Sequence, residues 1–205
     1  MNGLLVTIIL ALGLAVTLVR RRSAGITLVA AQSLALSAGA FTLAGGRSVA
    51  FLIAAIVLLV KAIVLPLLLR ALQRRTREPR LVPAARGPLE RLAAASALGL
   101  LAAVTLPDIA HTGAYVEHAA LALVLTGTLI VATRRPALHQ LLGVIVAENG
   151  CSLLAVAVPG GLSYVIELGA LVDLVLVVTV AAAFMQRIHL LLGTGNTELL
   201  SGLRD

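Results

Sequence analysis

Three long apolar stretches of the chain each hold one ionisable residue near their centre. These residues are Lys61, Glu148 and Asp173. A charge at that depth in a membrane costs roughly 2.5–3.5 kcal/mol on insertion scales, so such groups usually face a partner, a polar cavity or a proton path. A low dielectric favours the neutral form of a carboxyl group, which can then exchange a proton near neutral pH, and a nearby lysine favours the charged form. The pattern predicts a proton relay that includes all three residues.

Further polar residues extend this predicted relay. Glu167 lies six residues before Asp173, about 9 Å away along a helix and about 120° around it, so both can border one polar face. We include Glu167 in the relay. Asn149 adjoins Glu148, and Gln32 lies near the middle of an earlier apolar stretch. These two amides are candidates for a polar path that leads to the relay.

Two of the candidate residues also have simpler explanations. Lys61 paired with a carboxylate can be a static buried ion pair that fixes the register of two helices. His139 lies near the expected cytoplasmic end of its apolar stretch, where it is placed to take up protons and is included in the polar path. It can equally be an ordinary interfacial histidine. The residue pattern leaves these alternatives open.

The composition places these residues in a membrane protein. Of the 205 residues, 60% are hydrophobic and only 12% are charged, against roughly 25% in soluble domains. The mean hydropathy is +1.07, and the apolar residues form long runs that only helices can carry across a bilayer. We therefore expect an all-α, polytopic transmembrane helix bundle of about seven helices. The predicted helices span residues 2–19, 24–44, 48–72, 92–106, 118–133, 137–158 and 164–186.

The basic residues predict the orientation of this bundle. Positive residues favour the cytoplasmic side of a membrane, and an outside N-terminus with a cytoplasmic C-terminus places all but two of the 16 basic residues there. The exceptions are Arg47, in an outer loop, and Lys61, within a helix. The net charge of +7 is thereby explained by topology, so the expected partner is the lipid bilayer and not nucleic acid. Stacking platforms for bases are also missing, because aromatic residues make up 2% of the chain and Trp is absent.

The chain is expected to divide at its longest connection. Residues 1–72 form an N-terminal three-helix segment, and residues 73–91 form a basic, proline-containing cytoplasmic linker. This linker is either an ordinary solvated loop or a docking surface for a cytoplasmic partner. Residues 92–190 form a four-helix segment, and residues 191–205 form a short cytoplasmic tail.

Motifs for catalysis or cofactor binding are missing from the sequence. It has no CxxC, no His/Cys cluster with metal-ligand spacing, no glycine-rich phosphate loop and no nucleophile elbow. The single Cys151 lies in an apolar run and suggests no metal site. We expect no catalytic residue, metal or cofactor in this chain, so any redox chemistry must belong to a partner.

The last part of the chain carries a family resemblance. The stretch QLLGVIVAENGCSLLAVAVPGG, followed by YVIELGALVDLVLVVTVAAAFMQRIH, resembles hydrogenase-4 component E, a membrane subunit of formate-hydrogenlyase-type, complex-I-like assemblies. The same region, about 116–190, is similar to the NuoK-type subunit of complex I and more remotely to the C subunit of Mrp cation/proton antiporters. In the NuoK type, two successive helices each carry a buried Glu in the proton-conducting axis. Glu148 and Asp173 fall near those positions, with Asp in place of the second Glu.

The resemblance implies a function that the residues alone do not give. It implies a non-catalytic membrane subunit of a complex-I-like oxidoreductase in a bacterial cytoplasmic membrane. Its partners would be antiporter-like membrane subunits and a peripheral redox module, with NiFe and Fe–S centres only in those partners. Two alternatives remain open: a subunit of a multisubunit cation/proton antiporter, and a structural membrane scaffold. The role of Lys61 is not covered by the resemblance.

Overall fold

The chain folds into a bundle of helices. The computed structural model describes residues 2–44, 49–76, 87–105, 114–134, 136–157 and 178–179. Within this part of the chain there are six long helices and no strands. They are α1 (Gly3–Leu18), α2 (Arg22–Ala44), α3 (Val49–Thr76), α4 (Pro88–Thr105), α5 (Ala114–Thr133) and α6 (Ala137–Ala157). The all-α prediction is confirmed for these residues.

The length and composition of the helices fit a membrane. Among the described residues, five helices (α2 to α6) are long and apolar enough to cross a bilayer. Helix α1 is more apolar than these five but has only 16 residues. These features indicate a multi-pass membrane protein. The predicted seventh helix, 164–186, lies outside the described residues apart from Val178 and Thr179, which are helical. The count of seven and the orientation remain predictions.

The helices extend beyond the apolar runs from which they were predicted. Helix α4 begins at Pro88 and not at residue 92, because proline is well suited to the first helical turn, where its missing N–H leaves no bond unmade. Helix α3 continues to Thr76 through charged residues, since apolarity is not needed for helix formation once the chain leaves the membrane. Both helices therefore include residues of the predicted linker 73–91, of which 77–86 lie outside the described part.

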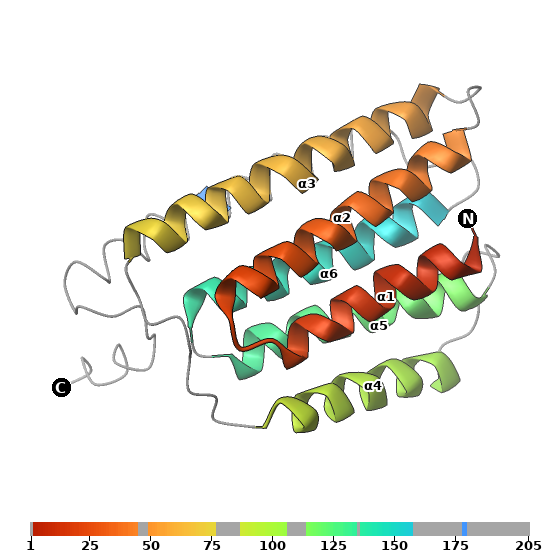
Figure 1. The fold of residues 1–205 in the computed structure, drawn as a ribbon. Helices are drawn as coiled ribbons and strands as arrows, with labels where there is room; N and C mark the ends of the chain where they lie inside the picture. Colours follow the sequence, from red (N-terminus) through yellow and green to blue (C-terminus); the bar gives the residue numbers. More distant parts are fainter. Residues whose placement is uncertain are drawn as a thin grey trace.

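The helices lie side by side, with α3 and α4 at opposite edges (Figure 1). Helix α3 packs mainly along α2 and meets α6 over a much shorter stretch, whereas α5 and α6 have the most extensive contact. Glycines allow this close approach. A Cβ on Gly143 would lie 2.7 Å from the carbonyl oxygen of Gly127, and one on Gly150 would lie 2.7 Å from that of Ala120. Small residues at such contacts are typical of membrane helices.

The up-and-down order gives the bundle one strongly basic end. The C-terminus of α1 and the N-terminus of α2 meet there with the start of α4 and the turn between α5 and α6 (Figure 1). This end carries Arg20, Arg21 and Arg22, together with Arg91 and Arg134. The polar groups in the middle of the bundle form a second, separate region.

Candidate functional site

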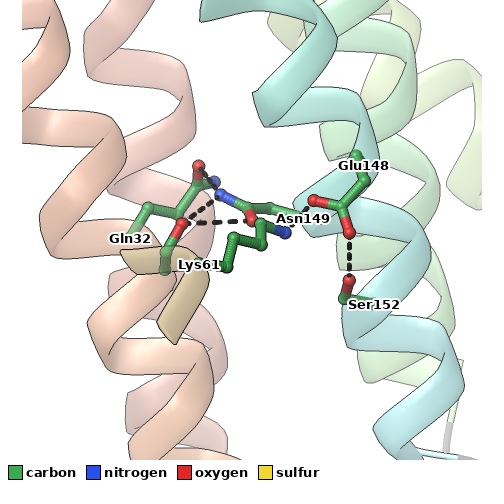
Figure 2. Close-up of polar contacts among 6 residues, drawn as sticks. Gln32, Lys61, Glu148, Asn149 and Ser152 are labelled. Carbon is green, nitrogen blue, oxygen red and sulfur yellow. Dashed lines mark hydrogen bonds and ion pairs between the residues drawn. The ribbon is translucent and has the colours of Figure 1, made fainter. Parts of the chain in front are cut away.

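An ion pair joins α3 to α6 in the middle of the bundle. The Lys61 ammonium pairs with Oε2 of Glu148, and Figure 2 shows the lysine side chain reaching from α3 toward that carboxylate. Lys61 is 1% exposed, whereas the side chain of Glu148 is 18% exposed. A buried ammonium is tolerated only when an opposite charge or hydrogen bonds compensate its lost hydration. Glu148 supplies that compensation from the neighbouring helix.

The second oxygen of the same carboxylate is also bonded. Ser152 lies one turn further along α6, and its hydroxyl donates to Oε1 of Glu148 over 2.8 Å (Figure 2). Glu148 thus has a charged partner on one oxygen and a neutral donor on the other. Both contacts stabilise the ionised carboxylate.

A cluster of amides and one hydroxyl lies beside the ion pair. The Asn149 Nδ2 donates to Oε1 of Gln32 over 2.9 Å and to the Ser33 hydroxyl over 3.1 Å. The Ser33 hydroxyl is also 3.3 Å from Oδ1 of Asn149. Gln32 in turn donates to the backbone carbonyl of Ile9 over 3.1 Å. We call Gln32, Ser33 and Asn149 the amide cluster; it connects α1, α2 and α6, and its three side chains are at most 2% exposed.

The ion pair and the amide cluster use different faces of α6. Glu148 and Asn149 are consecutive, so their side chains leave the helix about 100° apart. Glu148 is directed toward α3 and Asn149 toward α2 (Figure 2). No hydrogen bond among the described residues connects the Lys61 ammonium to the amide cluster. The backbone of α6 therefore positions both the ion pair and the amide cluster.

The structure brings together four of the residues singled out from the sequence. Lys61 contacts Glu148, and Asn149 contacts Gln32. His139 does not join them, because it lies nine residues before Glu148 on the same helix, about 13.5 Å by helical rise. It is 1% exposed, and neither ring nitrogen has a hydrogen-bond partner.

The two remaining relay candidates are not tested by this geometry. Glu167 and Asp173 lie outside the described residues, so their roles stay predictions.

Sequence reasoning missed two polar residues of the bundle. Ser33 was not among the candidate residues of the sequence, yet its hydroxyl completes the amide cluster. Its position next to Gln32 was the available signal. Glu117, in the first turn of α5, is only 3% exposed. The positive end of the helix dipole stabilises a carboxylate there, and an acidic residue at the start of an apolar run was the signal for it.

Comparison with known proteins gives one partial match. An uncharacterised protein of Mycobacterium tuberculosis is 31% identical over 87 residues, which cover 42% of this chain and 40% of that protein. The chain thus matches less than half the length of this relative. No protein-family model matches the chain, and no solved structure matches it.

Proposed function

We propose that this chain is a non-catalytic membrane subunit of a complex-I-like oxidoreductase of the hydrogenase-4 type, in which buried carboxylates help to move protons. The observation that carries the proposal is the ion pair of Lys61 and Glu148, held between two helices of an apolar bundle. Ionisable groups within the membrane are rare and are concentrated in ion and proton pathways. A purely apolar contact could have joined α3 to α6 without the free-energy cost of removing two charges from water.

The ion pair has the chemistry of a proton switch. Transfer of one proton from the ammonium to the carboxylate converts two charges into a neutral amine and a neutral acid, with no net change in charge. The neutral pair is favoured when the surroundings become drier, and the charged pair when water reaches Glu148. This internal transfer takes up no proton by itself. Net uptake requires protonation of Glu148 while Lys61 keeps its charge, which is favoured when α3 and α6 move apart. Renewed contact of the two charges favours release.

The rest of the path involves predicted elements and partners. Glu167 and Asp173, on the predicted seventh helix, would receive the proton from Glu148. Antiporter-like subunits would continue the path, and a peripheral redox module with NiFe and Fe–S centres would supply the energy. The predicted location is a bacterial cytoplasmic membrane, with the N-terminus outside.

A structural scaffold is the second candidate, and the amide cluster favours it. Its hydrogen bonds connect α1, α2 and α6, and they engage the side chains that would otherwise be free to pass on a proton. Such a network fixes helix register and orientation. In this reading the ion pair does the same for α3 and carries no protons.

The variant Glu148→Gln separates these candidates. Glutamine keeps the side-chain volume. Its single carbonyl oxygen can accept from Lys61 while its NH2 group donates to the Ser152 hydroxyl, but it cannot exchange a proton. We expect membrane vesicles containing the variant complex to lose redox-driven proton transport, measured with a pH-sensitive dye. Purification in mild detergent should recover the same partner subunits as the unmodified chain.

A matched control is Glu117→Gln, which removes another buried carboxylate from a different helix. It should leave proton transport and assembly unchanged. Normal transport in Glu148→Gln would contradict the relay and support the scaffold. Co-purification without any redox subunit would contradict the proposed complex, and co-purification of antiporter subunits alone would support the antiporter alternative.

A further inference from the structure

The basic end of the bundle contains a buried arginine without a partner. Arg91 lies in the first turn of α4 and is 2% exposed. None of its three guanidinium nitrogens has a hydrogen-bond partner in the part of the chain that the structure describes. Buried polar groups in native proteins are almost always bonded, and an unpaired charge is the costliest exception. Five N–H donors of one side chain are therefore left unbonded by the described residues.

Arg91 lies on the wall of a pocket between α4 and α5. The pocket has a volume of about 110 Å³ and is lined by Glu90, Arg91, Ala94, Leu129 and Thr133. This space is large enough for a group much bigger than a single water molecule. Glu90 is exposed and makes no hydrogen bond to Arg91. Its charge acts favourably on the guanidinium but leaves the N–H donors of Arg91 unbonded.

A second arginine lies next to the pocket and has spare donors. Arg134 directly follows the pocket residue Thr133 and is 3% exposed. Its Nη2 donates to the carbonyls of Thr17 and Val19, over 3.0 and 2.7 Å, at the C-terminus of α1. Its Nε and Nη1 have no partner. Arg134 is thus held in place by α1 while two of its nitrogens remain available.

The charges at this end repel one another. Burial, and then the nearby charges of Arg91 and Arg20, lower the pKa of Arg134 to about 10. His139 lies within electrostatic reach of Arg134, Arg22 and Arg91. Arg91 in α4 and Arg20 and Arg134 in two turns therefore concentrate positive charge at this end of the bundle. An anion in the pocket would relieve the repulsion and satisfy the unpaired donors of Arg91.

We propose that this pocket binds a phosphate group, supplied by the headgroup of an anionic phospholipid. A guanidinium matches two phosphate oxygens at once, which a chloride ion cannot exploit. The walls formed by Ala94 and Leu129 suit the apolar part of a lipid that begins beside its phosphate. Basic pockets between helices on the cytoplasmic side of a membrane are known to bind lipid phosphates. Free phosphate has the same chemistry and is the source to be distinguished.

The test uses the full chain, purified in mild detergent. Its thermal unfolding is measured with added phosphatidylglycerol, phosphatidylcholine or inorganic phosphate. A ligand that binds only the folded state raises the unfolding temperature with its concentration. We expect phosphatidylglycerol to raise it, and the other two to have little effect. An equal response to phosphatidylcholine would overturn the proposal, and an equal response to inorganic phosphate would overturn the lipid as the source.

Variants then test the pocket itself. Arg91→Gln should weaken the apparent affinity for phosphatidylglycerol by about tenfold or more, as expected for a lost charged hydrogen bond. Arg70→Gln removes an exposed arginine of α3 and should leave the affinity unchanged. Ala94→Leu fills the pocket but keeps every charge, so it covers the case in which Arg91→Gln fails to fold. The proposal would be overturned if phosphatidylglycerol stabilised either Ala94→Leu or Arg91→Gln as strongly as it stabilises the unmodified chain.

Discussion

The middle of the bundle and its basic end handle buried charge in opposite ways. In the middle, Lys61 and Glu148 have opposite signs and neutralise each other, and the amide cluster is bonded within the chain. At the basic end, Arg91 and Arg134 have the same sign, and five of their guanidinium nitrogens lack a partner among the described residues. The charges of the first region compensate each other, which suits a change within the protein. The second is incomplete and suits a ligand.

The largest expected effect comes from breaking the ion pair on one side only. Glu148→Ala leaves the buried Lys61 ammonium without a counter-charge, and removal of one partner of a buried pair typically costs about 3–5 kcal/mol. Because Glu148 is partly exposed, we expect about 3 kcal/mol, measured by thermal unfolding of the purified chain.

The double variant Lys61→Met with Glu148→Leu is the matched control for this prediction. It removes both charges at similar volume and should recover most of the stability. If Glu148→Ala alone were as stable as the unmodified chain, the middle region would not depend on charge compensation, and the contrast between the two regions would fail.

The next effect concerns the helix contact that supports both regions. Gly143→Ala would place a methyl group against the Gly127 carbonyl, and overpacking of this kind costs about 1–3 kcal/mol. The temperature of thermal unfolding should fall accordingly. Gly3→Ala, at a glycine with open space around it, is the control and should change little. Equal effects of the two substitutions would show that the close α5–α6 contact is unimportant.

A somewhat smaller effect is expected for the amide cluster. Asn149→Ala removes bonds to Gln32 and Ser33, and hydrogen bonds between membrane helices contribute about 0.6 kcal/mol on average and about 1.7 at most. We expect a loss of about 1–2 kcal/mol in unfolding free energy. Thr27→Ala removes a hydroxyl that bonds only to its own helix, and its smaller effect would set the baseline. A loss of 3 kcal/mol or more would mean that the two clusters in the middle act as one.

The smallest effect should distinguish the basic end most directly. Arg20→Gln removes an exposed charge that acts on both Arg91 and Arg134. It should stabilise the lipid-free chain on the order of 0.2–0.5 kcal/mol, because exposed charges are strongly screened. The gain should shrink as salt is added, since salt screens such repulsion. Destabilisation by this substitution at low salt would show that the basic end is not under repulsion.

The sequence allowed the helices to be predicted better than their contacts. Long apolar runs identified the cores of α2 to α6, because hydrocarbon permits few other structures. Their ends were less certain, since Pro88 and the charged end of α3 lie outside the apolar signal. Lys61 and Glu148 stood out by their depth, yet their pairing depends on how α3 and α6 are rotated. That rotation is set by packing across the whole bundle and has no local signature.

The basic end illustrates the same limit. The arginines were expected there as determinants of topology, a role for which they need only be exposed to water. Nothing in the local sequence separates Arg91 and Arg134, which are buried, from Arg20, which is exposed. Burial depends on the neighbouring helix ends that surround each guanidinium.

The unequal contacts of α6 have a mechanical consequence. Along one side its glycines bring it against α5, backbone to backbone, whereas α3 reaches it over a short stretch that includes the lysine. Helix α6 is thus held firmly to α5 and only loosely to α3. Any motion that stretches the lysine–glutamate contact should therefore displace α3 along α2, against which it packs, while α5 and α6 stay together.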